Sequence, residues 1–383
     1  MLIKDFTKHL ITRYGREEVS KWPFCVWNEP ETSKKMFGFD DNITFFNFYK
    51  NTFDTVKDVC PDIKFGSPSV LSMNDGNAQS WVTLFLKWTE KNNCKPEFMN
   101  IHYYSDIIPK NTDEFILSEA TASQFPKHTD DFSQYIKKMK KTFHSVGIND
   151  VPIYMTEWNF TLSHRNLISD TCFKACYILK NLLENYDQLD SFGYWCLTDL
   201  LEENSLPEKL FHGGLGIYTI NGLRKSVFYA FYFANMLGND LIKSGEGYFI
   251  TKKRNSYQII TYNYIHYGDL FASGEAFDLT QTSRYSPFNM TKQMSALINL
   301  SDMENGRYEV KEYYVNTNKG SAFDIWVDFG GIPLTPKDTE LLKGLCVPGF
   351  HMEYREIMDG SLEYNTLLEP LEMRFTEIRL IEE

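Results

Sequence analysis

Apolar residues in the first 240 positions follow two spacings in turn, which predict short strands and amphipathic helices. Helical spacing is clearest over residues 168–186, where apolar side chains recur every three or four positions. Other helices are predicted at 3–14, 43–56, 81–88, 132–143 and 224–237. Short apolar runs typical of buried strands lie at 22–27, 63–66, 98–102, 151–156 and 191–196. Five strands, each followed by a helix, predict parallel βαβ units with right-handed crossovers.

Beyond about residue 242 the chain changes to alternating apolar and polar residues, the pattern of half-exposed strands. Runs at 257–267, 296–300, 307–315 and 371–375 are predicted strands. Asn305-Gly306 predicts a hairpin between the second and third of these runs. We therefore predict an α/β domain over residues 1–240 and a small antiparallel β-sandwich over residues 241–383.

Composition narrows the class of protein. The chain has 383 residues, 43% of them hydrophobic and 23% charged, and its formal charge is −12. This net negative charge, without any basic run, argues against a nucleic-acid partner, because phosphate contacts need clustered Lys and Arg. No apolar stretch approaches the roughly 18 residues of a membrane helix, and no signal-peptide pattern opens the chain. We predict a soluble chain that is not exported and has no membrane partner.

The cysteines point to a reducing compartment. There are seven, an odd number, and no two form a CxxC pair, which predicts reduced thiols and a cytoplasmic location. Cys172 and Cys176 are one helical turn apart and could share a metal ion. Because no second pair and no nearby histidine accompany them, we predict two buried thiols on an apolar stripe instead.

Polar residues follow four of the five predicted strands. In parallel α/β architectures, ligands bind beyond the carboxyl ends of the strands. Two carboxylates at two strand ends are the arrangement that glycoside hydrolysis uses, one as a protonated acid and one as an ionised nucleophile or base. Aromatic rings beside them suit a sugar, whose apolar face packs on a ring. The residues at these strand ends are Asn28, Glu29, His102, Tyr103, Tyr104, Glu157, Trp195 and, shortly after, Asp199.

Each feature also has a purely structural interpretation. Asn28-Glu29-Pro30 could be a plain turn, Glu157 a solvated strand end, and His102 a hydrogen-bonded core histidine. Glu202-Glu203 could be a solvated loop pair, and His212-Gly213-Gly214 a flexible turn. Their joint occurrence in strand-end order favours a functional role.

Five motifs together resemble a known family. They are Trp-Asn-Glu-Pro at 27–30, Asn-Ile-His-Tyr-Tyr at 100–104, Thr-Glu-Trp at 156–158, Tyr-Trp at 194–195 and Phe-His-Gly-Gly-Leu-Gly at 211–216. The chain resembles glycoside hydrolase family 39, strongly to about residue 236 and weakly beyond it. That family comprises β-xylosidases and α-L-iduronidases, retaining enzymes on a (β/α)8 barrel with an accessory β-sandwich. The resemblance implies a retaining exo-glycosidase that acts on β-xylosides or small oligosaccharides and needs no metal and no organic cofactor.

The resemblance also implies roles for single residues. Glu29 would be the general acid/base and Glu157 the nucleophile, and Asn28 would bind the sugar 2-hydroxyl. His102 and Tyr104 would line the sugar subsite and hold the nucleophile in position. Trp195 would stack on the sugar, and Glu202 or Glu203 would accept hydrogen bonds from its outer hydroxyls. The implied substrate-binding residues are thus Asn28, His102, Tyr104, Trp195, Glu202, Glu203 and His212.

A full barrel needs eight strands, whereas the pattern supplies five, which would match strands four to eight of the family barrel. We therefore expect a partial (β/α)8 barrel over residues 1–240, followed by the sandwich. We also expect the chain to be the C-terminal part of a longer protein. Because an open sheet leaves two unpaired edges, an N-terminal complementing segment or a second copy of the chain could cover them.

Two other function classes stay open. Some AraC-type transcriptional regulators resemble this family in their C-terminal half, so the chain could be a sugar-sensing effector domain behind a helix-turn-helix. The coding sequence upstream would distinguish a sensor from an enzyme. An inactive carbohydrate-binding module is a third option, and the presence of both Glu29 and Glu157 favours hydrolysis over it.

Overall fold

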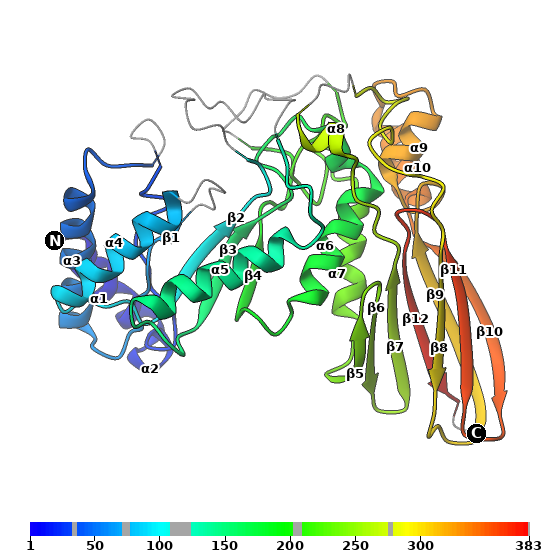
Figure 1. Ribbon diagram of the computed structural model, residues 1–383, viewed down its shortest axis with the longest axis horizontal. Helices are drawn as coiled ribbons and strands as arrows, with labels where there is room; N and C mark the ends of the chain where they lie inside the picture. The colour runs from blue at the N-terminus through cyan, green and yellow to red at the C-terminus, as the bar shows by residue number, and fades with distance from the viewer. Residues whose placement is uncertain (33–36, 71–76, 108–123, 202–208, 275–278, 382–383) are drawn as a thin grey trace. The chain divides into compact units, whose positions relative to one another are not determined.

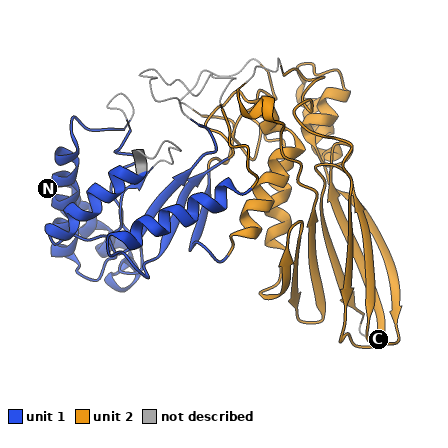
Figure 2. Cartoon of the chain, viewed as in Figure 1, with its two compact units in different colours: residues 1–115, 130–159, 187–194 blue, residues 116–129, 160–186, 195–383 orange. Residues whose placement is uncertain are grey.

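The computed structural model describes residues 1–32, 37–70, 77–107, 124–201, 209–274 and 279–381. The chain divides into two compact units, which Figure 2 colours separately. Unit 1 is Met1–Phe115, Asp130–Asn159 and Asp187–Tyr194, and unit 2 is Ile116–Thr129, Phe160–Tyr186 and Trp195–Glu383. The predicted domain boundary at residue 240 rests on a change of strand pattern and stays a prediction.

Unit 1 contains a parallel sheet with the strand order β1-β2-β3-β4 (Figure 1). These strands are Ser69–Val70, Met99–Tyr103, Ile153–Trp158 and Ser191–Tyr194. Beside β1, the first predicted strand forms two isolated parallel bridges, from Phe24 to Phe65 and from Asn28 to Ser69. The five predicted strands therefore lie in the predicted order and run parallel, but the first forms bridges only and β1 begins three residues beyond the run predicted at 63–66. Their numbering within a (β/α)8 barrel stays a prediction.

The helices of unit 1 are α1 (Leu2–Tyr14), α2 (Arg16–Val19), α3 (Asn42–Val59), α4 (Asn77–Lys91) and α5 (Asp131–Ser145). The side chain of Asp41 caps α3 by accepting a hydrogen bond from the Thr44 N–H. Aromatic side chains pack α3 against α4. The ring centroids of Tyr49 and Phe85 are 4.9 Å apart, and those of Phe46 and Trp81 are 5.6 Å apart. Aromatic residues make up 16% of the chain, and part of this share packs these two helices together.

Strand β3 carries one extra residue, Thr156. Ile101 of β2 pairs with Met155, but the next residue, His102, pairs with Glu157. Such a β-bulge re-aims the side chains beyond it, because they no longer follow the simple alternation of the strand. Gly193 of β4 leaves room for the bulge, since a Cβ there would lie 2.6 Å from the Thr156 carbonyl oxygen.

Unit 2 contains two antiparallel sheets and several helices (Figure 1). One sheet has the order β10-β9-β12-β7-β6-β5 and the other consists of β11 and β8. The two sheets share an apolar core that includes Ile259, Ile298 and Val310, so they form the predicted sandwich. The strands are β5 (Asp240–Gly245), β6 (Tyr248–Lys253), β7 (Ser256–Tyr262), β8 (Met294–Leu300), β9 (Gly306–Val315), β10 (Gly349–Ile357), β11 (Leu362–Leu368) and β12 (Met373–Leu380).

The helices of unit 2 are a 3-10 turn η1 (Leu167–Asp170), α6 (Cys172–Glu184), α7 (Ser226–Asn235), α8 (Asp269–Ala272), α9 (Ala322–Asp328) and α10 (Pro336–Leu345). Helices α6 and α7 confirm two predicted helices, and the three that follow them were not predicted. Within the described residues, no helix combines the length and the apolar character needed to cross a membrane. All seven cysteines are free thiols, and Cys172 and Cys176 are buried as predicted, whereas Cys25 is exposed.

The predicted hairpin at Asn305-Gly306 is wrong. Strand β8 pairs with β11, whereas β9 pairs with β10 and β12, so the chain crosses from one sheet to the other at this turn. The Asn305 side chain accepts a hydrogen bond from the Gly360 N–H at 3.0 Å. It therefore holds the neighbouring turn between β10 and β11 instead of closing a hairpin.

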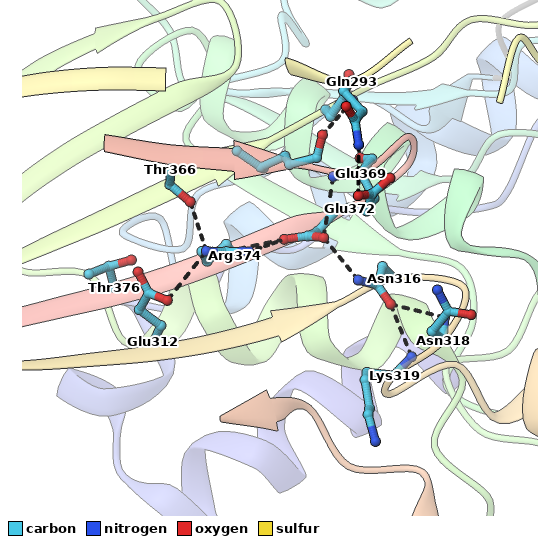
Figure 3. Close-up of polar contacts among 12 residues, drawn as sticks. Gln293, Glu312, Asn316, Asn318, Lys319, Thr366, Glu369, Glu372, Arg374 and Thr376 are labelled. Carbon is cyan, nitrogen blue, oxygen red and sulfur yellow. Dashed lines mark hydrogen bonds and ion pairs between the residues drawn. The ribbon is translucent and has the colours of Figure 1, made fainter. Parts of the chain in front are cut away.

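A cluster of charged and polar side chains joins β9, β11 and β12 in the sandwich (Figure 3). The Arg374 guanidinium donates to Glu372 at 2.7 Å, to Thr366 at 2.7 Å and to Glu312 at 3.3 Å. Asn316 donates to the other carboxylate oxygen of Glu372 at 2.9 Å. Because the Glu372 side chain is only 2% exposed, its charge depends on these partners for stabilisation.

Replacing Arg374 by methionine should lower the free energy of unfolding by about 3 kcal/mol, because it leaves the buried Glu372 carboxylate without its cation. Arg379 lies on the same strand, pairs with Glu309 and has a side chain that is 54% exposed. Arg379→Met should therefore cost less than about 1 kcal/mol. Urea unfolding followed by circular dichroism compares the two variants, and equal losses would contradict this assignment.

Gly193→Ala should cost about 1 to 3 kcal/mol of stability, because the added Cβ would collide with the Thr156 carbonyl. Gly344 of α10 is a matched control, since a Cβ there meets no atom within 4 Å. Gly344→Ala should raise stability by about 0.5 to 1 kcal/mol. Thermal melts of both variants measure the difference. A Gly193→Ala protein as stable as the wild type would show that the bulge does not need this glycine.

Candidate active site

Glu29 is held at the end of the first strand segment of unit 1. Its backbone N–H donates to the Ser69 carbonyl at 2.8 Å, and its own carbonyl accepts from the Thr32 hydroxyl at 2.7 Å. Trp27 and Glu29 have φ angles of 74° and 44°, in the left-handed region that residues other than glycine seldom adopt. Backbone of this kind is concentrated at functional sites, where the surrounding structure holds it in place. The Glu29 side chain is only 6% exposed.

His102 lies between the two predicted catalytic carboxylates. Its Nδ1 is 2.8 Å from Glu29 Oε1 and 3.7 Å from Glu157 Oε2. Its Nε2 is 3.1 Å from the Thr156 hydroxyl, which also lies 3.2 Å from the Ser69 hydroxyl. When Glu29 is ionised it can only accept, so Nδ1 then carries the hydrogen and Nε2 accepts from Thr156. His102 therefore orients Glu29 more directly than it steadies Glu157.

Glu157 follows the bulge and meets the hydroxyl of Tyr104, which donates a hydrogen bond to its Oε1. The Glu157 side chain is 16% exposed, more than that of Glu29, so it is the more accessible of the two carboxylates. One carboxylate oxygen of each glutamate lies within 4.8 Å of the other. Retaining glycosidases separate their carboxyl groups by about 5 to 5.5 Å, and inverting enzymes by about 6.5 to 9.5 Å. One oxygen of each carboxylate within 4.8 Å of the other is compatible with the shorter of these two separations, which are measured between whole carboxyl groups.

The same three residues could also hold a divalent cation. Among the described residues, Glu29, His102 and Glu157 are the one group of three such side chains whose ligand atoms lie within 4.8 Å of one another. His102 Nδ1 and Glu29 Oε1 already share a hydrogen bond, which a metal ion would have to replace. The predicted absence of a metal stays a prediction.

The structure brings four of the predicted site residues together in one unit. Glu29, His102, Tyr104 and Glu157 meet in unit 1, and Asn28 lies half-buried beside Glu29. Trp195 and His212 belong to unit 2, and their predicted contacts with the sugar stay predictions. The peptide bond from Trp195 to Cys196 is cis. Glu202 and Glu203 lie outside the described residues.

Sequence reasoning missed two residues of the site, Ser69 and Thr156. Thr156 stands in the Thr-Glu-Trp motif, which was the available signal, but simple alternation along the strand would turn it away from its neighbour Glu157. The bulge allows both side chains to take part. Ser69 carries no signal of its own in the sequence, because only the pairing of β1 with β2 brings it to the site.

Comparison with known proteins gives consistent results. The model of Glycosyl hydrolases family 39 matches residues 1–341. A β-xylosidase of Geobacillus stearothermophilus is 28% identical over 383 residues, which are 99% of this chain and 70% of that protein. An uncharacterized HTH-type transcriptional regulator of Staphylococcus aureus is 22% identical over 176 residues, 46% of this chain and 22% of that protein.

The fold has solved counterparts as well. The structure of a monomeric β-xylosidase from Caulobacter crescentus CB15 superposes with a TM-score of 0.83, at 22% identity, and the match covers 100% of this chain and 74% of that one. At this identity the likeness bears on the fold alone. The family match is independent of it and spans well over half of the chain. Together with the paired glutamates at the strand ends, it shows that the chain belongs to glycosyl hydrolases family 39 and is a glycoside hydrolase.

Proposed function

We propose that the chain carries the catalytic residues of a retaining exo-glycosidase that hydrolyses β-xylosides. Glu157 is the nucleophile and Glu29 is the general acid/base. The observation that carries this proposal is the short separation of the two carboxylates, within 4.8 Å between one oxygen of each. The β-xyloside substrate is proposed from the β-xylosidases of Geobacillus stearothermophilus and Caulobacter crescentus, which the chain resembles.

In the first step, Glu157 attacks the anomeric carbon while protonated Glu29 gives its proton to the glycosidic oxygen. The bond between the anomeric carbon and the glycosidic oxygen breaks, and the leaving group departs as an alcohol. A covalent ester then joins the sugar to Glu157. The Tyr104 hydroxyl donates a hydrogen bond to Oε1 of Glu157 and so helps to orient the nucleophile. His102 likewise engages Oε1 of Glu29, so Oε2 is the oxygen that carries the proton to the substrate.

In the second step, Glu29 is ionised and takes a proton from a water molecule, which attacks the anomeric carbon. The ester bond to Glu157 breaks, and the sugar leaves with its original anomeric configuration. Ionised Glu29 accepts a hydrogen bond from His102 Nδ1–H, which stabilises this form of the carboxyl group. His102 is therefore a positioning residue for the acid/base throughout the cycle.

The remaining residues of the proposed sugar site contact the substrate outside the reacting atoms. We assign Asn28 to the 2-hydroxyl, where a hydrogen bond strengthens as the transition state forms. Trp195 stacks on the sugar face, and His212 with Glu202 or Glu203 binds outer hydroxyls. Within the described residues the parallel sheet has four strands and one bridged segment, so we propose that an N-terminal complementing segment or a second copy supplies the rest of a barrel. A cytoplasmic location stays a prediction.

Glu157→Ala in the complete protein should lower turnover of an aryl β-xyloside by about a thousandfold or more, because no covalent intermediate can form. Added azide should restore turnover by attacking the vacated face of the sugar, and the product should be a glycosyl azide of inverted configuration. Glu29→Ala with azide should instead give the retained configuration. Glu340→Ala, at a side chain that is 71% exposed, is the control and should stay fully active. No azide rescue, with Glu29→Ala fully active, would overturn both assignments.

Removal of divalent cations tests the alternative that the two glutamates and His102 bind a metal. Turnover of the same xyloside should be unchanged after dialysis against a chelator, because carboxylates alone perform both steps. Adding back zinc or manganese should not raise the rate. Loss of activity on chelation, restored by one of these ions, would show that the group is a metal site.

A sugar-sensing role is the second candidate, and the likeness to the HTH-type regulator of Staphylococcus aureus favours it. A sensor would bind xylose or a xyloside with measurable affinity in calorimetry while turning over no aryl β-xyloside. An enzyme would both bind the xyloside and turn it over, and replacing Glu157 should abolish that turnover. Sequencing upstream of the coding region for a helix-turn-helix separates the two candidates independently.

A further inference from the structure

A buried lysine lies between two buried carboxylates in unit 2, and neither proposed catalytic step uses it. The Lys225 side chain is 1% exposed, and those of Asp170 and Asp199 are 0% exposed. Lys225 Nζ lies 2.5 Å from Asp170 Oδ1 and 3.2 Å from Asp199 Oδ2. Burial lowers the pKa of Lys225, but the two carboxylates outweigh it and raise the pKa, so the lysine is charged. Burying three charges is costly unless each has further partners.

Those further partners are backbone groups of one segment, Phe211–Gly216. The Gly213 N–H donates to Asp170 Oδ2 at 2.6 Å, and the Gly216 N–H donates to Asp199 Oδ1 at 2.7 Å. Lys225 Nζ donates to the Gly214 carbonyl at 2.8 Å. These are charge-assisted hydrogen bonds, which are stronger than bonds between neutral groups. Each member of the cluster therefore holds one residue of the segment.

The close approach of this backbone explains its three glycines. A Cβ at Gly213 would lie 2.3 Å from the Asn166 carbonyl carbon, and one at Gly214 would lie 2.3 Å from Asp199 Oδ1. A Cβ at Gly216 would lie 2.4 Å from the Asp199 nitrogen. Side chains at these positions would push the backbone away from the cluster and break its hydrogen bonds.

The two side chains that precede these glycines are held differently. Phe211 is fully buried, and its ring lies 5.3 Å from that of Trp326 and 5.5 Å from that of Phe323, both in α9. His212 is half-buried, and its buried Nδ1 has no hydrogen-bond partner among the described residues. Nδ1 therefore does not fix the imidazole, whereas the backbone on either side of His212 is anchored by Phe211 before it and by the cluster after it.

We propose that Asp170, Lys225 and Asp199 are positioning residues that fix the backbone of His212–Gly216 and thereby orient the His212 imidazole for its contact with the sugar. The three come from different places in the chain: the end of η1, the segment after β4 and the residue before α7. The role of His212 rests on the proposed function. The hold on the backbone rests only on the contacts above and can be tested without any substrate.

Amide hydrogen exchange at Gly213 and Gly216 tests the hold on the backbone. Asp170→Asn keeps the size of the side chain but removes its charge, and it should speed exchange at Gly213 about tenfold or more while changing Gly216 less. Asp199→Asn should have the reverse effect. Lys343→Met, at a lysine 42% exposed and paired with Glu340, is the control and should change neither amide. A folded Asp170→Asn protein with unchanged exchange at Gly213 would overturn the proposal, and so would equal acceleration at both amides and throughout α7.

The sugar contact is tested by kinetics of the complete protein on an aryl β-xyloside. Asp170→Asn should raise KM several-fold and change kcat much less, and His212→Ala should do the same. If the cluster acts through His212, the double variant should have the KM of His212→Ala alone. Two KM effects that multiply would show that the cluster does not act through His212. If the wild type turns over no xyloside, the proposed function fails, whereas the exchange measurements still decide whether the cluster holds the backbone.

Discussion

The hydrogen bond between His102 and Glu29 is the contact on which the geometry of the site most depends. The segment that carries Glu29 joins the sheet through isolated bridges and through the hydrogen bond from the Glu29 N–H to the Ser69 carbonyl, so its backbone places the residue but does not direct its carboxyl group. His102 is part of β2 and is held in turn by Thr156 of β3. Both partners of the bond are at most 6% exposed, so water competes little for either group and the bond is correspondingly strong.

Much of unit 1 could be predicted from the sequence because parallel strands place their carboxyl ends along one edge. That rule alone brings Glu29, His102, Tyr104 and Glu157 together. The bulge at Thr156 could not be predicted, since an extra residue alters pairing with a neighbour without altering local composition. The mistaken hairpin at Asn305-Gly306 has a similar cause. Turn residues specify a reversal of the chain, but burial of distant strands decides which sheet the next strand joins.

The buried cluster of charged residues in unit 2 could not be predicted from the sequence either. Asp170, Asp199 and Lys225 stand 29 and 26 positions apart, and no pattern of spacing links them before the chain folds. The Phe-His-Gly-Gly segment could be recognised as a motif, yet the reason for its glycines lies in atoms contributed by other segments. In both this cluster and that of Arg374, backbone or polar side chains complete the partners of each ion, which is the condition for a buried charge to be tolerated.

The exposure of a single thiol makes the first strand segment experimentally accessible. Cys25 is the one exposed cysteine among the seven, and it precedes Glu29 by four residues. Four fully extended residues would span about 13 Å, and the left-handed backbone at Trp27 and Glu29 shortens this separation. A maleimide dye or a nitroxide spin label should react at Cys25 before it reaches the six buried thiols, although partial burial raises the pKa of the Cys25 thiol and slows this reaction. Fluorescence or electron paramagnetic resonance at that label would report on the strand that ends in the acid/base glutamate.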